Sequence, residues 1–403
     1  MAPSDFERAL DEGIAGYLDF RKRNAAVSLS KLLLKFNGRW PESQWTLWMG
    51  NERKLKDKIP SDWFDRGWIC PLALSAEQCS AYGLARQIDW GSGGKALDVC
   101  AGLGIDAAAM AESGFSVTAL ESNPVLARAL DHNFAVLEHQ ITVLPTPAEV
   151  FFEKNTDRFD LLYADPDRRP ADRKALALED CRPNPVDQIA VWKNRASRVW
   201  IKLSPMFDAD EAIRRLGESH LEAVEAWSWN GEVKELLVRY GAPTTQPAQR
   251  RVRIAAHNAP LLCMESDWNT PQPSVLDRSS SLDLPPIASG QILADPAPAL
   301  HKMHLYAALG QRYPDAVWIS PTTHWMLFQT PPVAFPGKIY RLLRKFDRKQ
   351  DRGSALEPLL RNYPDKAEVL RKQHRLLPGG RDRLVGFRNA HGQIELWIAE
   401  ALP

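Results

Sequence analysis

Cysteine is scarce in this 403-residue sequence, and no two cysteines form a C-x-x-C pair. This argues against a disulfide framework and against a zinc site built on cysteine pairs. His301 and His304 have H-x-x-H spacing, but no carboxylate or cysteine partner repeats nearby, so we predict no metal site. We expect the cysteines to be small buried hydrophobic residues, and they are Cys70, Cys79, Cys100, Cys181 and Cys263.

Long apolar runs are also missing, since no stretch reaches the roughly 18 apolar residues of a membrane-spanning helix. The N-terminus MAPSDFERALDEG has neither a basic region nor an apolar core, so we expect no membrane association and a cytoplasmic location. A net excess of one charge sign is absent too: 51 Lys and Arg face 50 Asp and Glu. Net charge therefore identifies no partner, and the distribution of charge has to be considered instead.

The most informative stretch is KALDVCAGLGIDAAAMAESGFSVTALE, residues 95–121. Ala96–Cys100 and Phe115–Leu120 are short apolar runs typical of buried strands, and Ile105–Ser113 is an alanine-rich run typical of a helix. The glycine turn Ala101–Gly104 joins the first strand to the helix, and Glu121 follows the second strand. This pattern predicts the first βαβ unit of a doubly wound parallel sheet.

The ligand of this turn could be a dinucleotide or a nucleoside of another kind. Gly102 and Gly104 fit a dinucleotide fingerprint, which tolerates an alanine at its third glycine. Asp98 beside the turn would repel a pyrophosphate, but it suits a ligand that carries an ammonium and a sulfonium. An ordinary glycine turn without a ligand is the remaining alternative.

LDVCAGLG followed by Glu121 resembles motif I of the class I S-adenosylmethionine-dependent methyltransferases. In that family an acid at this place holds the ribose of the cofactor. The residue that would contact the adenine stays unassigned, because Pro145, Thr146 and Pro147 stand where many members carry an acid. The resemblance implies S-adenosyl-L-methionine as cofactor, bound by Asp98, Cys100, Ala101, Gly102, Gly104, Glu121 and Ser122.

A second motif follows the predicted strand Phe159–Ala164 and reads DPDRR. It resembles the D/N-P-P-aromatic motif of amino-methyltransferases, in which the acid and the next carbonyl accept hydrogen bonds from the substrate amine. Asp165 and Pro166 fit these catalytic roles. The stacking aromatic is missing, and Arg168 and Arg169 stand there instead. These arginines are suited to bind RNA phosphates or a substrate carboxylate, and the alternative is a salt-bridged loop involving Asp172 or Glu179.

The predicted fifth strand, Arg198–Leu203, carries Lys202 near the same edge of the sheet. An apolar strand rarely contains a lysine unless its ammonium reaches a cleft or solvent, and Lys202 is a third catalytic candidate. Glu225–Asn230 and Glu235–Tyr240 then read as two strands joined around Gly231. They match the reversed hairpin that distinguishes the methyltransferase sheet from the common dinucleotide-binding sheet.

Residues 1–90 are predicted to form a helical N-terminal domain with five tryptophans. Aromatic residues beside basic ones can bind nucleic acid, but we expect these five to pack in the core, given the area that each one buries. They are Trp40, Trp45, Trp48, Trp63 and Trp68.

The remaining chain is predicted to comprise a methyltransferase domain (91–270), a linker (271–290) and a C-terminal region. From Pro336 onward, fifteen Lys and Arg stand against eight Asp and Glu. A basic face of this kind indicates RNA binding, and a solvated helix face is the alternative.

Several motifs together resemble the bacterial methyltransferases with a C-terminal THUMP-like domain, from about Leu74 to the end of the chain. They are LDVCAGLGIDA, DPDRR, DCRPNP, IKLSPMFD, WNGEVKELL, ADPAPAL and LRKQHRLLPGGRDRL. The resemblance implies a Rossmann-like class I α/β core, a ferredoxin-like segment (291–335) and a THUMP-like domain (336–403). In other proteins this combination of domains binds tRNA or other structured RNA.

These features predict direct (SN2) methyl transfer to a base nitrogen of tRNA or rRNA. No covalent intermediate is expected, because Cys181 lies sixteen residues beyond Asp165 with no base beside it. Two alternatives stay open. One is an RNA-binding protein with a degenerate methyltransferase core, and the other is a small-molecule methyltransferase with a basic tail.

Overall fold

The computed structural model describes residues 10, 13–168, 177–256, 260–270, 286–320 and 323–402. The chain divides into two compact units, Met1–Val224 with Glu235–Gln246, and Glu225–Lys234 with Pro247–Pro403. Most of the predicted linker 271–290 lies outside the described residues. Among the helices that are described, none has the length and apolar character needed to cross a membrane.

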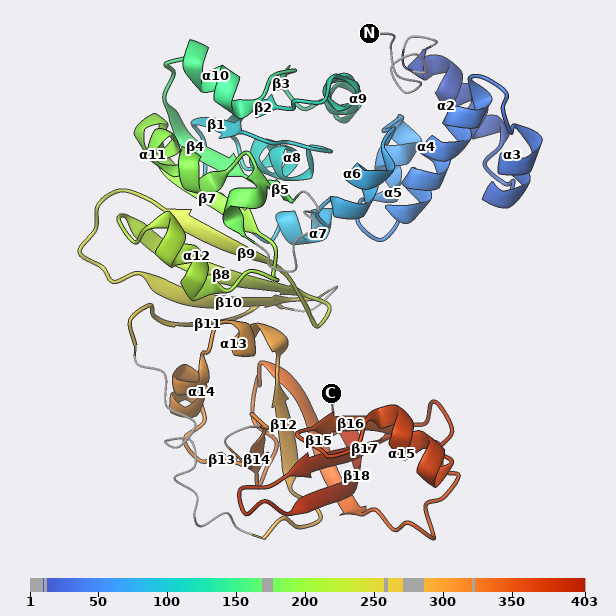
Figure 1. Ribbon diagram of the computed structural model, residues 1–403, viewed down its shortest axis with the longest axis vertical. Coiled ribbons are helices and arrows are strands. Elements are labelled where there is room, and N and C mark those ends of the chain that lie inside the picture. The colour runs from blue at the N-terminus through green and yellow to red at the C-terminus, as the bar shows by residue number, and fades with distance from the viewer. Residues whose placement is uncertain are drawn as a thin grey trace. The chain divides into compact units, whose positions relative to one another are not determined.

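The first unit begins with a group of short helices, drawn in blue in Figure 1. They are α2 (Ile14–Arg23), α3 (Leu29–Lys35), α4 (Glu42–Lys54), α5 (Ser61–Arg66), α6 (Ala73–Gln78) and α7 (Tyr82–Ala85). Their core contains Tyr17, Phe20, Trp45 and Trp48. Trp63 and Trp68 are buried as well, and Trp40 is partly buried and packs against this core. The prediction of core packing is confirmed for the four buried tryptophans and holds in part for Trp40.

A buried asparagine ties this helical layer to the α/β core. Asn133 lies in α9 (Pro124–Leu137) and is fully buried. Its side chain accepts a hydrogen bond from the Ile69 N–H at 2.9 Å and donates one to the Ile69 carbonyl at 3.0 Å. Because both polar ends of the amide are satisfied, its burial costs little and its geometry is specific. The segment that leads into the sheet is thereby fixed against α9.

The central sheet has nine strands in the hydrogen-bonded order β11-β10-β8-β9-β7-β4-β1-β2-β3. The strands are β1 (Lys95–Asp98), β2 (Ser116–Leu120), β3 (Ile141–Leu144), β4 (Phe159–Ala164), β7 (Ala196–Leu203), β8 (Leu221–Trp229), β9 (Glu232–Tyr240), β10 (Gln249–Ala255) and β11 (Leu262–Asp267). Strands β3, β2, β1, β4 and β7 are parallel, and β9 runs antiparallel to β7. The predicted parallel sheet with a reversed hairpin is confirmed, and the carboxyl ends of its parallel strands meet at one edge.

Helices connect the parallel strands, as a doubly wound sheet requires. They are α8 (Ile105–Glu112), α9, α10 (Ala148–Lys154), α11 (Pro185–Arg195) and α12 (Ala209–Leu216). The side chain of Asn123 caps α9 by accepting the Val125 N–H at 2.9 Å, and Pro124 occupies the first turn. Asn184 caps α11 in the same way. Between β4 and α11 lie β5 (Asp167–Arg168), the 3₁₀ turn Leu178–Asp180 and β6 (Cys181–Arg182), and β5 pairs with β6.

In the second unit, the C-terminal part forms one seven-stranded sheet in the order β13-β14-β12-β15-β18-β17-β16. The strands are β12 (Ile292–Pro296), β13 (Val317–Trp318), β14 (Met326–Phe328), β15 (Gly337–Lys345), β16 (Glu357–Arg361), β17 (Asp382–Arg388) and β18 (Ile394–Leu402). The helices are α13 (Pro298–Lys302), α14 (Tyr306–Arg312) and α15 (Ala367–His374), coloured orange to red in Figure 1. Both predicted C-terminal segments, 291–335 and 336–403, contribute strands to this sheet and share one core.

The cysteines are free thiols, as expected, but not all of them are buried. Cys70 and Cys181 are buried, whereas Cys263 is exposed, so the expectation of burial is wrong for that residue. The reason is that β11 is the outermost strand of the nine-stranded sheet, where alternate side chains face solvent. The other two cysteines, Cys79 and Cys100, are partly buried.

Candidate cofactor and active site

Two glycines shape the turn between β1 and α8, and they do so for different reasons. Both have positive φ, +55° at Gly102 and +75° at Gly104. A Cβ on Gly104 would lie 2.5 Å from Phe134 Cζ, so this glycine allows α9 to pack closely on the turn. A Cβ on Gly102 would meet no atom within 4 Å. Gly102 therefore borders open space, which is where a ligand could approach the backbone.

Glu121 directly follows β2 and is 8% exposed. Its Oε2 accepts the Gly102 N–H at 3.1 Å, and its Oε1 accepts the Asn123 N–H at 2.7 Å. Burial raises the pKa of this carboxyl, and the same two N–H groups oppose that rise. Since a carboxylate offers about four acceptor positions, both oxygens keep capacity for a pair of ligand hydroxyls. The neighbouring Ser122 is exposed.

Asp98 ends β1 and is 2% exposed. Its Oδ1 accepts the Cys100 N–H at 3.1 Å, which holds the carboxyl beneath the turn. Burial, and then the nearby Asp106, raise the pKa of Asp98 well above its usual range. Ala101 is fixed to β2 by a hydrogen bond from its N–H to the Leu120 carbonyl at 2.9 Å. The turn is thus anchored on both sides and carries a buried acid that a cation would stabilise.

Asp165 follows β4 at the same edge of the sheet. Its N–H donates to Cys100 Sγ at 3.1 Å, which joins the end of β4 to the turn after β1. The side chain of Asp165 is 39% exposed, and one of its oxygens, Oδ2, lies 2.7 Å from the Lys202 ammonium. Burial raises the pKa of the Asp165 carboxyl, and Lys202 opposes that rise. Pro166, the next residue, is buried.

Lys202 is almost fully buried in β7, with an 8% exposed side chain. Its ammonium lies 2.8 Å from Asp106 Oδ2 and also donates to the Ser80 hydroxyl. Burial alone would lower the pKa of Lys202, but the carboxylates of Asp106 and Asp165 raise it well above its usual range. The lysine is therefore a permanent cation held between two acids, and it fixes one oxygen of Asp165.

Two residues of this network, Asp106 and Ser80, were missed in the sequence. Asp106 lies in the first turn of α8 and is buried, and Ser80 lies in the loop before α7 and donates to Asp106 Oδ2 at 3.3 Å. An acid in the first turn of an otherwise apolar, alanine-rich helix was the available signal for Asp106. Ser80 could not be identified from the sequence, because it is 122 positions away from Lys202.

The remaining predicted residues lie in or beside a short ribbon. The backbone of Arg168 belongs to β5, while its side chain, Arg169 and Asp172 lie outside the described residues. Glu179 pairs with Arg215 at 3.0 Å. Cys181, in β6, is 1% exposed, which leaves it shielded from any substrate.

Metal ligation finds no support in the described part of the chain, where no group of three or more His, Cys, Asp or Glu could hold an ion. His301 of the H-x-x-H pair uses both ring nitrogens in other contacts. Nδ1 lies 3.1 Å from the Tyr306 hydroxyl, and Nε2 lies 3.1 Å from the Pro296 carbonyl.

The strand order and the reversed hairpin define a class I methyltransferase-like α/β fold with a mixed sheet. The chain is similar to the crystal structure of a candidate methyltransferase from Porphyromonas gingivalis W83. The TM-score is 0.82 and the sequence identity 23%, and the match covers 97% of this chain and 98% of the other.

Two further solved structures match over shorter stretches. One is a candidate RNA methyltransferase from Pyrococcus horikoshii (12% identity, 48% of this chain and 96% of the other, TM-score 0.32). The other is a candidate class I S-adenosylmethionine-dependent methyltransferase from Listeria monocytogenes (10% identity, 63% and 84%, TM-score 0.36). No protein-family model and no curated protein matches the sequence. At 23% identity the Porphyromonas similarity establishes the fold.

Proposed function

We propose that this protein is an S-adenosylmethionine-dependent methyltransferase that modifies a base nitrogen of structured RNA, tRNA or rRNA. The observation that carries the proposal is the position of Asp165. It follows β4, is hydrogen-bonded to Cys100 in the turn after β1, and has one carboxylate oxygen fixed by Lys202. Doubly wound proteins keep their chemistry at this edge of the sheet. The Porphyromonas protein of the same fold is itself described as a candidate methyltransferase.

The residues present fit the cofactor. S-adenosylmethionine supplies an electrophilic methyl group on a sulfonium. Glu121 is oriented by two backbone N–H groups and would accept the ribose hydroxyls, and the open space beside Gly102 would admit the ligand close to the backbone. Asp98 would bind the ammonium, because a buried carboxyl with a raised pKa gains most from a cation. We assign Cys100, Ala101, Gly104 and Ser122 to the same site.

Asp165 orients the nucleophile. Its free oxygen accepts a hydrogen bond from the substrate amine, and the Pro166 carbonyl accepts a second one. Lys202 holds the other oxygen of Asp165 in place before substrate arrives, so little reorganisation is needed during reaction. Bound S-adenosylmethionine would supply the methyl group, which the nitrogen held by Asp165 would accept while the C–S electron pair stays on sulfur. Asp165, whose pKa is raised, or water would take the proton that the nitrogen loses.

A covalent enzyme intermediate is not part of this mechanism. Cys181 is buried, and burial raises the pKa of the Cys100 thiol well above its usual range. A thiol that stays protonated is a weak nucleophile. Arg168 and Arg169 follow the catalytic acid in sequence, and we assign them to RNA phosphates.

The test combines two measurements on the full-length protein. Calorimetry should show that wild type, Asp165→Ala and the control Glu153→Ala, an exposed acid in α10, bind S-adenosylmethionine alike. Single-turnover methylation of bulk RNA should fall roughly 10²-fold in Asp165→Ala alone, the scale of one lost electrostatic group. Asp165→Asn should be milder, because the amide oxygen still accepts.

Three outcomes would overturn the proposal. Absence of cofactor binding in the wild type would favour the degenerate-core alternative. Cofactor binding without salt-dependent RNA binding would favour a small-molecule substrate. A wild-type rate in Asp165→Ala would place the chemistry elsewhere.

A further inference from the structure

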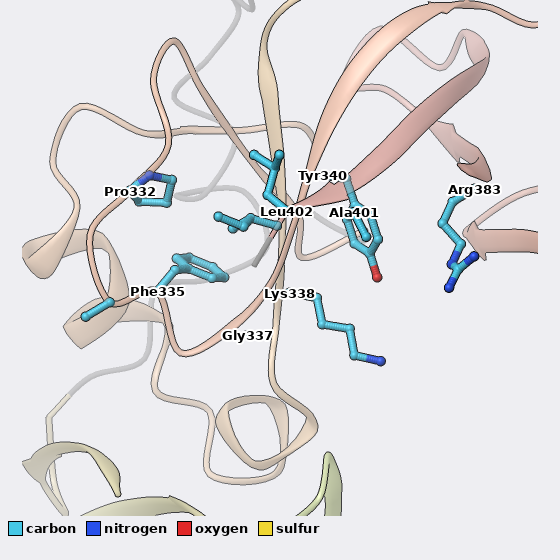
Figure 2. A pocket seen from close by; sticks show the side chains of 10 residues that line it. Pro332, Phe335, Gly337, Lys338, Tyr340, Arg383, Ala401 and Leu402 are labelled. Atoms are coloured by element: carbon cyan, nitrogen blue, oxygen red, sulfur yellow. The ribbon is translucent and has the colours of Figure 1, made fainter. Parts of the chain in front are cut away.

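The C-terminal sheet carries a pocket that has no part in the site above. It lies where β15 begins and β18 ends, with a volume of about 440 Å³. That size is within the range of roughly 300–1,000 Å³ that is usual for small-ligand sites. Figure 2 shows the side chains that line it, among them Pro332, Phe335, Lys338, Tyr340, Arg383 and Leu402.

The pocket has two chemically different sides. Pro332, Phe335 and Leu402 form an apolar side, and the ammonium of Lys338, the hydroxyl of Tyr340 and the guanidinium of Arg383 lie on the other (Figure 2). A ligand that fits both sides has a flat apolar part and an anionic part. Aromatic and apolar side chains bind flat rings, and a guanidinium with an ammonium binds phosphate oxygens.

Among the described residues, neither pocket cation forms an ion pair with a carboxylate, whereas several other cations of this region do. In this sheet Arg341 pairs with Glu400 at 2.8 Å, and Arg361 pairs with Asp295 at 3.4 Å. Arg344 and Arg371 are paired as well, with Asp351 and Glu357.

Lys338 forms no hydrogen bond or ion pair within the described part of the chain. It lies opposite Asp295 in the register of β12 and β15, and its charge opposes the rise in the pKa of that carboxyl. Among the described residues, Arg383 Nη1 donates only to the backbone carbonyls of Gly380 at 3.3 Å and Asp382 at 3.5 Å. Both side chains therefore keep donors that an anion can use.

The other pocket residues are rigidly held. Tyr340 is 4% exposed, and burial raises the pKa of its hydroxyl, so it remains a hydrogen-bond donor at neutral pH. Phe335 is 7% exposed and packs against Tyr313 and Phe328, with ring centroids 5.4 and 5.9 Å apart. A pocket built from side chains that are already fixed loses little entropy when a ligand binds.

We propose that this pocket binds one unpaired nucleotide of the RNA substrate, with its phosphate on Lys338, Tyr340 and Arg383 and its base against Phe335. The proposal rests on the proposed function for the identity of the nucleic acid. A single-stranded RNA is required, because a base reaches a pocket of this kind only when it is free of its stack. The pocket then recognises an unpaired nucleotide, which a merely basic surface does not do.

The test compares two double variants of the full-length protein that lose the same charge. Lys338→Ala/Arg383→Ala removes the pocket cations, and Lys349→Ala/Arg352→Ala removes two exposed cations between β15 and β16. Anisotropy of a fluorescein-labelled single-stranded RNA of about ten nucleotides reports affinity. We expect a loss of about tenfold or more for the pocket variant and less than about threefold for the control, since only the first removes desolvated phosphate contacts. Equal losses of RNA affinity in the two double variants would overturn the proposal that the pocket binds a nucleotide.

Further measurements distinguish a free nucleotide from RNA as the ligand of the pocket. They also distinguish the pocket proposal from the proposed methyltransferase function. Calorimetry with AMP and with adenosine, in saturating S-adenosylmethionine so that the cofactor site is filled, tests the phosphate, and the pocket requires that AMP binds more tightly. Tight AMP binding without any effect of the pocket variant on RNA affinity would assign the site to free nucleotides and overturn the RNA assignment. The pocket variant should bind S-adenosylmethionine like the wild type. Wild type that binds RNA through the pocket but no S-adenosylmethionine would overturn the proposed function alone.

Discussion

Lys202 and Asp165 form an ion pair of 2.7 Å that joins β7 to the end of β4. The lysine is almost entirely buried, while the aspartate keeps 39% of its side chain exposed. The cation is thus inaccessible to a substrate, and the acid is accessible. We therefore expect Lys202 to position Asp165 without itself contacting the reacting atoms.

Lys202→Met is expected to affect stability and catalysis together. It leaves Asp106, which is 8% exposed, as a buried carboxylate without its cation. Breaking such a pair costs roughly 3–5 kcal/mol. The single-turnover rate should also fall, because Asp165 loses the group that orients it. Urea unfolding and single-turnover kinetics measure the two effects.

The double variant Lys202→Met/Asp106→Asn separates them. Removing the unpaired charge should restore most of the stability, whereas the methylation rate should stay low. A single Lys202→Met variant with wild-type rate would exclude the positioning role.

Glu121→Ala should weaken S-adenosylmethionine binding by about 1.5–3 kcal/mol, the scale of two lost charge-assisted hydrogen bonds. Glu121→Gln should also weaken it, because one end of the amide would present N–H donors to the N–H of Gly102 or Asn123. Calorimetry measures the affinity, with Glu153→Ala as the control. Unchanged affinity in folded Glu121→Ala protein would remove this residue from the cofactor site.

Gly102→Ala should mainly reduce cofactor affinity, and Gly104→Ala should mainly reduce stability. In Gly102→Ala the new methyl group enters open space, so stability should fall only by the 1–2 kcal/mol typical of a left-handed alanine, while cofactor affinity drops about tenfold or more. In Gly104→Ala the methyl group meets Phe134 and Leu130, so unfolding should be affected more strongly. Thermal unfolding and calorimetry distinguish them. Equal cofactor affinity in Gly102→Ala and wild type would show that the open space does not hold the ligand.

The sequence predicted the βαβ unit, the reversed hairpin and the place of Lys202, because each depends on a local pattern. Apolar runs predict strands, glycine predicts the turn, and a lysine in an apolar strand is expected to reach a cleft or solvent. The Lys202 ammonium is instead buried between Asp106 and Asp165. It did not predict what Lys202 contacts. Asp106 and Ser80 are 96 and 122 positions away, and such pairings follow only from the folded topology.

The single C-terminal sheet could not be predicted from the sequence either. Strand β12 pairs with β14 on one side and with β15 on the other, so it connects segments that composition had separated. That Lys338 and Arg383 form no ion pair within the described residues also depends on tertiary structure. Counting charges showed a basic excess, but it could not show which cations already have carboxylate partners.

Glu52 should make the stability of the N-terminal helices depend on pH. Burial raises the pKa of this carboxyl from 4.5 to about 7, although Arg21 opposes the rise. The raised folded-state pKa means that the stabilising contribution is present below pH 4.5 and is lost as the pH rises through 7. The loss amounts to about 3 kcal/mol at most, from 1.36 kcal/mol per pKa unit.

Urea unfolding at pH 5 and pH 8 checks this expectation. Wild type should lose stability between the two pH values relative to Glu52→Gln, which cannot titrate. Parallel pH profiles of the two proteins would show that Arg21, bonded to both Glu52 oxygens at 3.1 Å, keeps the acid ionised throughout.

Asp98 should link cofactor binding to proton release. Burial raises its pKa well above the usual range in the free protein, and the ammonium of a bound S-adenosylmethionine would lower that pKa by stabilising the carboxylate. Binding therefore expels a proton wherever the free protein is still protonated. Affinity should rise with pH up to the raised pKa and become constant above it.

Calorimetry in two buffers with different ionisation enthalpies measures the protons released. Glu121 and the cofactor's own amino group also titrate, so the contribution of Asp98 is the difference between wild type and Asp98→Asn. That variant should bind more weakly and release fewer protons, because the amide keeps the hydrogen bond from the Cys100 N–H but carries no charge. Equal proton release in both proteins would show that the ammonium binds elsewhere, and the acid beneath the turn would then serve only to shape the loop.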